Sequence, residues 1–142
     1  MRWWNRAAAR VMTAIGVTAA TGGTGYGWIG HRHERCSGSK VGAEVHVDAV
    51  PLLAATRDYL ARGFRPAGTI RNAETFRSRV HLRGVDDSEF TLMCDAQTSG
   101  GLLMSVPQDK LGAIEKRFRE GGLFYANVGR VTDRPGTVTL MH

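Results

Sequence analysis

The sequence predicts an α+β fold in which a mixed β-sheet is layered with α-helices. Helical apolar periods and short strand-like runs are interspersed along the 142 residues, without the strict strand–helix repeat of a parallel α/β protein. Glycine and proline separate most of these segments, and no internal repeat or low-complexity linker divides them. We therefore expect one domain over residues 1–142, a length that can bury a proper hydrophobic core.

Five segments carry helix signals. In the first, apolar residues recur on one face, and Gly16 suits the left-handed position after a helix. Pro51 suits the first turn of another helix, and Asp86 and Asp87 suit the cap of a short one. The helix after Pro51 would have an apolar face made of Leu52, Leu53, Ala55, Tyr59 and Leu60. The expected helices cover residues 6–15, 26–36, 51–62, 89–93 and 108–120.

The strand signals are shorter. The run 101–106 is strongly apolar, and Val45 and Val47 alternate with His46, which we expect on the strand surface. Residues 64–73 are expected to form a loop. The expected strands cover residues 17–21, 41–47, 80–82, 101–106, 124–131 and 137–140.

The composition is that of an ordinary globular protein, with 42% hydrophobic and 23% charged residues. The formal net charge of +6 raises the question of an acidic partner. A nucleic-acid surface would gather its basic residues on one face with aromatic residues between them. Here the arginines stand singly between apolar residues, so nucleic acid is not the expected partner. These scattered residues are Arg57, Arg62, Arg65, Arg71, Arg77, Arg79 and Arg83.

The N-terminal sequence and the cysteines bear on localisation. Residues 1–20 faintly resemble a signal peptide, but Arg10 interrupts their apolar run. No stretch approaches the length needed to span a bilayer. Cys36 and Cys94 form no Cys-x-x-Cys pair and suit a reducing cytoplasm. We expect a cytoplasmic protein without membrane contact, in which both cysteines are small buried or half-buried residues.

Two glycine-rich segments are candidates for chemistry. The first, residues 21–27 (Thr-Gly-Gly-Thr-Gly-Tyr-Gly), lies between an expected strand and an expected helix. Such a loop lets backbone N–H groups approach an anion at a helix N-terminus, although a tight structural turn explains it equally well. The second, residues 95–101 (Asp-Ala-Gln-Thr-Ser-Gly-Gly), could position a phosphate or a metal-bound water. Alternatively, Asp95 and Thr98 bond their own backbone, and the residues alone leave both interpretations open.

The second segment carries a family resemblance. Residues 95–103, Asp-Ala-Gln-Thr-Ser-Gly-Gly-Leu-Leu, are similar to a signature near the end of selenophosphate synthetases (selenide, water dikinases), with Ala96 where proline is usual. Other motifs stand in the order and spacing of that family, and together they cover essentially the whole chain. They are Asn5–Ala9, Ala19–Thr21, Asp48–Leu53, Gly63-Phe64, Gly68-Thr69, Asn72, Val106-Pro107 and Val128-Gly129. The resemblance implies the C-terminal domain shared with aminoimidazole ribonucleotide synthetase and its relatives.

That family implies an activity and a division of labour. Its members convert selenide, ATP and water to selenophosphate, AMP and phosphate, with Mg²⁺-bound ATP between two domains. The nucleophilic cysteine or selenocysteine, a nearby lysine and most metal-binding aspartates belong to the N-terminal domain, which this sequence lacks. The resemblance thus implies a partner, either an N-terminal half or another copy of the chain, and no activity of the chain alone. The candidate residues of the ATP cleft are Thr21, Thr24, Gly25, Asp95, Gln97, Thr98, Ser99, Gly100 and Gly101.

One metal ligand of the family falls within this chain. The family pattern Ala-Thr-Asp-Val-Thr-Gly-Phe-Gly reads Ala-Thr-Gly-Gly-Thr-Gly-Tyr-Gly from residue 20, so Gly22 replaces the aspartate. Because Mg²⁺ needs oxygen ligands, we expect no metal to bind through this position. His31, His33 and Cys36 follow in a stretch that departs from the family, and we expect polar surface residues there rather than a zinc site.

Three hypotheses follow for function. The chain could be half of a split selenide, water dikinase that works only with a separate N-terminal half. It could be a decayed fragment without catalysis, which Gly22 and the missing nucleophile favour. The third hypothesis, a basic binding module, depends only on the net charge and predicts binding that weakens steeply with salt.

Overall fold

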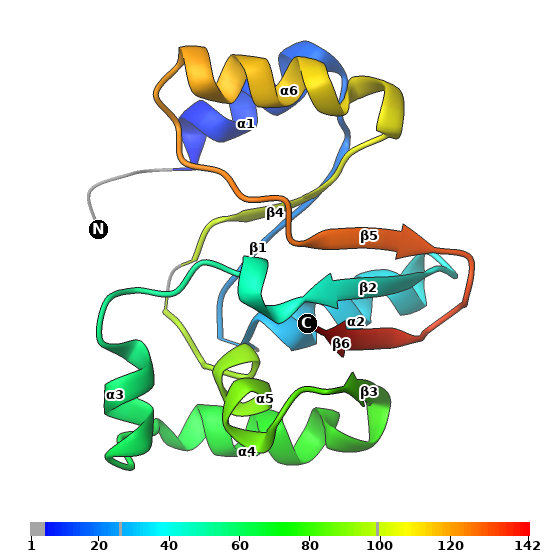
Figure 1. Ribbon diagram of the computed structural model, residues 1–142. Helices are drawn as coiled ribbons and strands as arrows, with labels where there is room; N and C mark the ends of the chain where they lie inside the picture. The colour runs from blue at the N-terminus through cyan, green and yellow to red at the C-terminus, as the bar shows by residue number, and fades with distance from the viewer. Residues whose placement is uncertain (1–4, 26, 99) are drawn as a thin grey trace. The chain divides into compact units, whose positions relative to one another are not determined.

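The computed structural model describes residues 5–25, 27–98 and 100–142, which form two compact units (Figure 1). The first unit comprises Met1–Gly22 and Gly100–Tyr125, and the second comprises Gly23–Ser99 and Ala126–His142. Neither unit is continuous in sequence, because the chain leaves the first unit, builds most of the second, returns, and leaves again. The expectation of one domain over all 142 residues remains a prediction.

The first unit is a two-stranded sheet with two helices that pack together. Strands β1 and β4 are antiparallel, with Ala19 opposite Ser105 and Gly22 opposite Leu102. Its core is centred on Val17, Ile114 and Phe118. The first helix ends at Gly16, which is left-handed (φ 73°) as expected, and whose carbonyl accepts a hydrogen bond from Lys110. The elements are α1 (Arg6–Ile15), β1 (Ala19–Gly22), β4 (Leu102–Ser105) and α6 (Gln108–Glu120).

The second unit is built on a four-stranded mixed sheet of order β3-β6-β2-β5. The central strands β6 and β2 are parallel, β3 is parallel to β6, and β5 is antiparallel to β2. Buried apolar side chains of β2 and β6, such as Val45, Val138 and Leu140, form the centre of the core. The strands are β2 (Gly42–His46), β3 (Val80–Arg83), β5 (Gly129–Thr132) and β6 (Val138–Met141).

Four helices of this unit belong to the same core or border it. Helix α2 packs against β2 and β6, and it also contacts α4 and α5. Helix α5 begins with a capping box. The Asp86 side chain accepts a hydrogen bond from the backbone N–H of Glu89, and the Glu89 side chain accepts one from the backbone N–H of Asp86. The helices are α2 (Gly27–Gly38), α3 (Thr56–Ala61), α4 (Ala67–Phe76) and α5 (Asp87–Met93), with short 3-10 turns η1 (Val47–Ala49) and η2 (Arg77–Arg79).

The predicted α+β class with a mixed sheet is confirmed, and so is the helix cap at Asp86. Both cysteines are buried thiols and His46 is exposed, as expected. The surface expected at His31, His33 and Cys36 was wrong, because both histidines are half-buried and Cys36 belongs to the core. Among the described residues, no helix combines the length and apolar character required to cross a membrane.

Three further expectations were wrong. Residues 64–73 are not a loop, because α4 occupies most of them. The buried side chains of α4 include Thr69 and Asn72, and because these residues are polar, the sequence shows no clear apolar face there. The helix expected from Pro51 begins only at Thr56, and most of its supposed apolar face is exposed, with Leu53 at 87%, whereas Leu60 is half-buried against the core. The strand expected over residues 124–131 begins at Gly129, because the preceding residues run without strand pairing.

Candidate functional site

The two glycine-rich segments meet within the second unit. The backbone N–H of Gly25 donates to the carbonyl of Gln97 at 2.7 Å. The neighbouring N–H of Thr24 donates to His31 Nε2 at 2.9 Å. These two N–H groups are therefore engaged within the chain, as in the tight-turn interpretation of the first loop. The polar groups of the second loop are then the better candidates for contact with a ligand.

Helix α4 holds both loops with two polar side chains. Asn72 Nδ2 donates to the carbonyls of Gly25 at 3.1 Å and Cys94 at 3.0 Å, so one amide group ties the first loop to the second. Thr69 Oγ1 donates to Asp95 Oδ1 at 3.0 Å and accepts from the Ala96 N–H at 3.1 Å. Both side chains are buried, at 9% and 2% exposure, where hydrogen bonds must be satisfied to be tolerated. We call Thr69 and Asn72 the α4 clamp.

Glycine is required where the helices approach the second loop. Gly27, the first residue of α2, has φ +70°, and a Cβ there would lie 2.7 Å from both the carbonyl carbon and oxygen of Cys94. A Cβ on Gly68, next to Thr69, would lie 2.7 Å from the Ala96 Cβ. Any larger residue at either position would push the helix away from the loop. The close approach thus depends on glycine at both positions.

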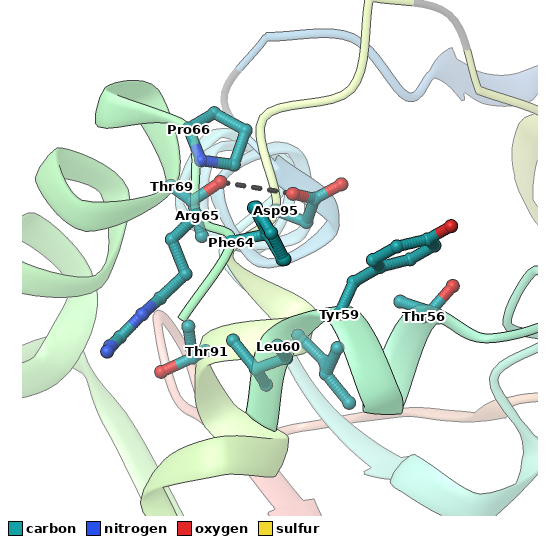
Figure 2. Close-up of a pocket in the computed structure, with 10 residues that line it drawn as sticks. Thr56, Tyr59, Leu60, Phe64, Arg65, Pro66, Thr69, Thr91 and Asp95 are labelled. Atoms are coloured by element: carbon teal, nitrogen blue, oxygen red, sulfur yellow. Dashed lines mark hydrogen bonds between the residues drawn. The ribbon is translucent and has the colours of Figure 1, made fainter. Parts of the chain in front are cut away.

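A hollow of about 170 Å³ opens beside Asp95 (Figure 2). One carboxylate oxygen of Asp95 faces Thr69, and the other points away from it. The rings of Tyr59 and Phe64 meet edge to face, with centroids 6.0 Å apart. The hollow therefore combines a carboxylate, hydroxyls and exposed aromatic surface. Its lining residues are Thr56, Tyr59, Leu60, Phe64, Arg65, Pro66, Thr69, Thr91, Leu92 and Asp95.

This arrangement limits the chemistry that the hollow can support. A carboxylate repels a bare phosphate, so Asp95 could contact one only through a bridging cation or a donor group of the ligand. The aromatic rings offer apolar faces against which a flat ligand group could pack. The hollow is thus suited to a ligand that has a hydrogen-bond donor or a bound cation together with an apolar portion.

The structure brings together only part of the predicted site. Thr24, Gly25, Asp95, Gln97 and Thr98 belong to the second unit, where the contacts above connect Gly25 to Gln97 and attach Gly25 and Asp95 to α4. The others belong to the first unit, apart from Ser99, which lies outside the described residues. In the first unit, Thr21 is paired with Leu103 in the sheet, Gly100 accepts a hydrogen bond from Asn5 at 3.2 Å, and Gly101 is exposed.

The sequence analysis did not identify as site residues the α4 clamp or the aromatic wall of the hollow, which is formed by Tyr59 and Phe64. Gly68-Thr69 and Asn72 stand among the motifs of the family resemblance, and that spacing was the signal that could have pointed to them. Of the two aromatic residues Tyr59 and Phe64, only Phe64 had the same signal, in the motif Gly63-Phe64, whereas Tyr59 looked like an ordinary apolar position.

The Cys94 thiol lies between α5 and the second loop but is unsuited to nucleophilic chemistry. Its side chain is fully buried, and this burial raises the pKa of Cys94 to about 12. A thiol with so high a pKa stays protonated at neutral pH, and the thiolate is the reactive form. We predict that iodoacetamide leaves Cys94 unmodified in the folded protein and alkylates it in urea, as measured by mass spectrometry of the peptide. Equal rates in both conditions would contradict the buried, protonated thiol.

Comparison with known proteins places the chain in a family. Residues 3–141 match the family model described as AIR synthase related protein, C-terminal domain. Selenide, water dikinase from Yersinia pseudotuberculosis is 43% identical over 118 residues, which cover 82% of this chain and 33% of that protein. The enzyme of the same name from Caldanaerobacter subterraneus is 36% identical, and the alignment covers 94% of this chain and 39% of that protein. For the Pseudomonas aeruginosa enzyme the identity is 38%, and the alignment covers 92% of this chain and 37% of that protein.

A solved structure shows the same fold. The crystal structure of hydrogenase maturation protein HypE in complex with ATP aligns with a TM-score of 0.58 at 18% sequence identity, covering 96% of this chain and 36% of that one. The chain spans about a third of the length of the curated relatives it matches. With the family model matched over nearly every residue, the chain belongs to the family of AIR synthase related C-terminal domains and is similar to the selenide, water dikinases.

Proposed function

We propose that this chain is the C-terminal-domain portion of a selenide, water dikinase, which converts selenide, ATP and water to selenophosphate, AMP and phosphate. The relatives that carry this name support the proposal, since their identity to this chain extends over most of its length. In this proposal the chain does not turn over substrate alone. It works with the portion of the enzyme that its relatives have and that it does not match.

The observation that carries the proposal is the clamped pair of loops. Asn72 and Thr69 fix residues 24–25 and 94–96 in one arrangement, although these segments are about 70 residues apart in sequence. A decayed sequence would have no reason to keep a buried amide with two partners and two glycines at positions of close approach. In the proposal this rigid loop pair borders the nucleotide, and Asp95 accepts a donor or cation from it.

The resemblance to selenide, water dikinases implies Mg²⁺, and one position for it does not fit. Gly22 stands where the family pattern has an aspartate, and glycine offers no side-chain oxygen. A Cβ at Gly22 would meet nothing within 4 Å, and its backbone is not left-handed. The Cβ that an aspartate requires would therefore be accommodated there without strain.

A two-chain mixture tests the proposal. The chain would be combined with the unmatched portion of the Pseudomonas aeruginosa enzyme, and selenide-dependent AMP formation would be followed. We expect no AMP from the chain alone and slow formation in the mixture. Gly22→Asp should raise the rate in the mixture by at least about tenfold, which corresponds to roughly 1.4 kcal/mol of transition-state stabilisation by a restored ligand.

Gly112→Asp is the matched control for this experiment. Gly112 lies in α6, and a Cβ there would also meet nothing within 4 Å, so the control adds the same charge at another open glycine. We expect it to leave the rate of the mixture unchanged. Selenide-dependent AMP formation by the chain alone would contradict the proposed division of labour. If the mixture is folded but forms no AMP, with or without Gly22→Asp, the hypothesis of a decayed, non-catalytic fragment would be favoured.

A further inference from the structure

A second group of polar side chains gathers where three parallel strands end. Strands β3, β6 and β2 run in the same direction, and their last pairs place Arg83 and His46 beside Met141. The residues that follow each strand therefore emerge at one edge of the sheet. The carboxyl ends of parallel strands are where α/β proteins commonly bind ligands.

Three potential metal ligands lie together at this edge. Asp48 comes from η1 after β2, Glu89 from the first turn of α5 after β3, and His142 from the end of β6. One ligand atom from each lies within 4.8 Å of the others, and among the described residues this is the set of three such side chains that comes together. Glu89 is mostly buried, with its side chain at 13% exposure, whereas Asp48 and His142 are exposed.

The imidazole of His142 is oriented by the two carboxylates. Its Nδ1 lies 2.9 Å from Asp48 Oδ2, and its Nε2 lies 3.2 Å from Glu89 Oε2. A carboxylate that accepts from one ring nitrogen and leaves the other for a metal is the usual support of a metal-binding histidine. Two ligands of a tetrahedral Zn²⁺, each about 2.0–2.1 Å from the ion, lie roughly 3.3 Å apart. The separation of Nε2 and Oε2 therefore suits one ion between them.

We propose that Asp48, Glu89 and His142 form a site for a divalent transition-metal ion such as Zn²⁺ or Co²⁺. His142 Nε2 and the Glu89 carboxylate are the direct ligands, and water completes the coordination. Asp48 is a positioning residue that holds the imidazole through Nδ1. Because imidazole suits Zn²⁺ and Co²⁺ whereas Mg²⁺ prefers oxygen ligands, the site should discriminate against Mg²⁺.

One neighbouring charge opposes the ion. Arg57 Nη1 lies 3.7 Å from Glu89 Oε1 and competes for that carboxylate. Its side chain is about half exposed, so the competition is weak. Arg57→Gln should leave the ligands in place and strengthen metal binding. This change provides a variant whose expected effect has the opposite sign to that of ligand removal.

The site can be tested by titrating the untagged 142-residue chain with Co²⁺ at neutral pH. The readouts are the visible absorption of bound Co²⁺ and calorimetry, followed by competition with Zn²⁺. We expect one ion per chain, no heat with Mg²⁺, and at least about tenfold weaker binding in His142→Gln and Glu89→Gln. Glu89→Gln keeps the capping box, since glutamine also serves that role. Asp48→Ala should weaken binding by about 10- to 100-fold, as for other supporting carboxylates.

His81→Ala is the matched control, because His81 is also an exposed histidine at the sheet but lies outside the group. We expect its metal affinity to equal that of the natural chain, and circular dichroism of each variant verifies folding. Unchanged affinity in folded His142→Gln would overturn the proposal. It would equally be overturned by no binding at millimolar Zn²⁺, or by equal losses in His81→Ala and His142→Gln.

Discussion

Replacing Gly27 by alanine should lower the free energy of unfolding by about 3 kcal/mol or more. A left-handed backbone costs an L-residue about 1–2 kcal/mol, and overpacking adds about 1–3 kcal/mol. Both costs apply at Gly27, which has φ +70° and whose Cβ would lie 2.7 Å from backbone atoms of Cys94. Backbone atoms cannot swing aside as a side chain can. The expected result is a large shift of the urea midpoint without a change in the slope.

Two other glycines of the same segment separate the causes. Gly25 is also left-handed (φ +62°), but a Cβ there would meet nothing within 4 Å, so Gly25→Ala should cost only the backbone strain of about 1–2 kcal/mol. Gly22 has neither constraint, and Gly22→Ala should be close to neutral. Equal destabilisation by Gly27→Ala and Gly25→Ala would contradict the close approach of Gly27 to the Cys94 backbone.

Replacing Asn72 by aspartate should cost about 3 kcal/mol or more at neutral pH. The substitution exchanges an amide that donates to two carbonyl oxygens for a carboxylate that faces the same oxygens. The position is buried, so solvent cannot compensate for the repulsion, and an uncompensated buried charge is strongly destabilising. Asn72→Ala, which only removes the two hydrogen bonds, should cost less, about 1–3 kcal/mol.

The aspartate variant also has a distinctive pH dependence. Burial and the facing carbonyls disfavour the charged form, so the pKa of the introduced carboxyl should be raised in the folded state. Folded protein then binds the proton more tightly than unfolded protein, and the destabilisation should shrink as the pH falls below that raised pKa. Urea unfolding at neutral and acidic pH measures this difference against the natural chain. A deficit that stays constant across this range would contradict a buried carboxyl at this position.

Asn127→Asp provides the control for the same change of chemical group. Asn127 is exposed, and its Oδ1 accepts from the Gly129 N–H at 3.4 Å, a role that a carboxylate oxygen can also fill. We expect this variant to be nearly neutral at both pH values. A loss as large as that of Asn72→Asp would mean that the effect is not specific to the α4 clamp.

The sequence predicted well those features of the fold that depend on neighbouring residues. The capping box at Asp86, the left-handed Gly16 and the apolar period of α6 each depend on residues within a few positions of one another. Helix α4 was missed because its buried face includes Thr69 and Asn72, whose partners lie 22 to 47 residues away in sequence. Periodicity of apolar residues cannot report a helix that is held by polar contacts over such separations.

The candidate site shows the same division. Both glycine-rich segments were identified from their composition, since glycine, small hydroxyls and a carboxylate are visible in the sequence. Their contact through Gly25 and Gln97 was not predicted, because it depends on the path of the chain between them. The group of Asp48, Glu89 and His142 was not predicted for the same reason. Three parallel strands bring these residues together, and their spacing in the sequence gives no sign of it.

The central claim, that this chain is the C-terminal-domain portion of a selenide, water dikinase, can be tested most directly in a single polypeptide. In a chimera, this chain would replace the 130 residues that it matches in the Pseudomonas aeruginosa enzyme. Selenophosphate would then be measured by phosphorus NMR in the presence of ATP and selenide. We predict that the chimera carrying Gly22→Asp forms selenophosphate and that the chimera with the natural glycine forms it more slowly. A folded chimera that carries Gly22→Asp and forms no selenophosphate would contradict the claim.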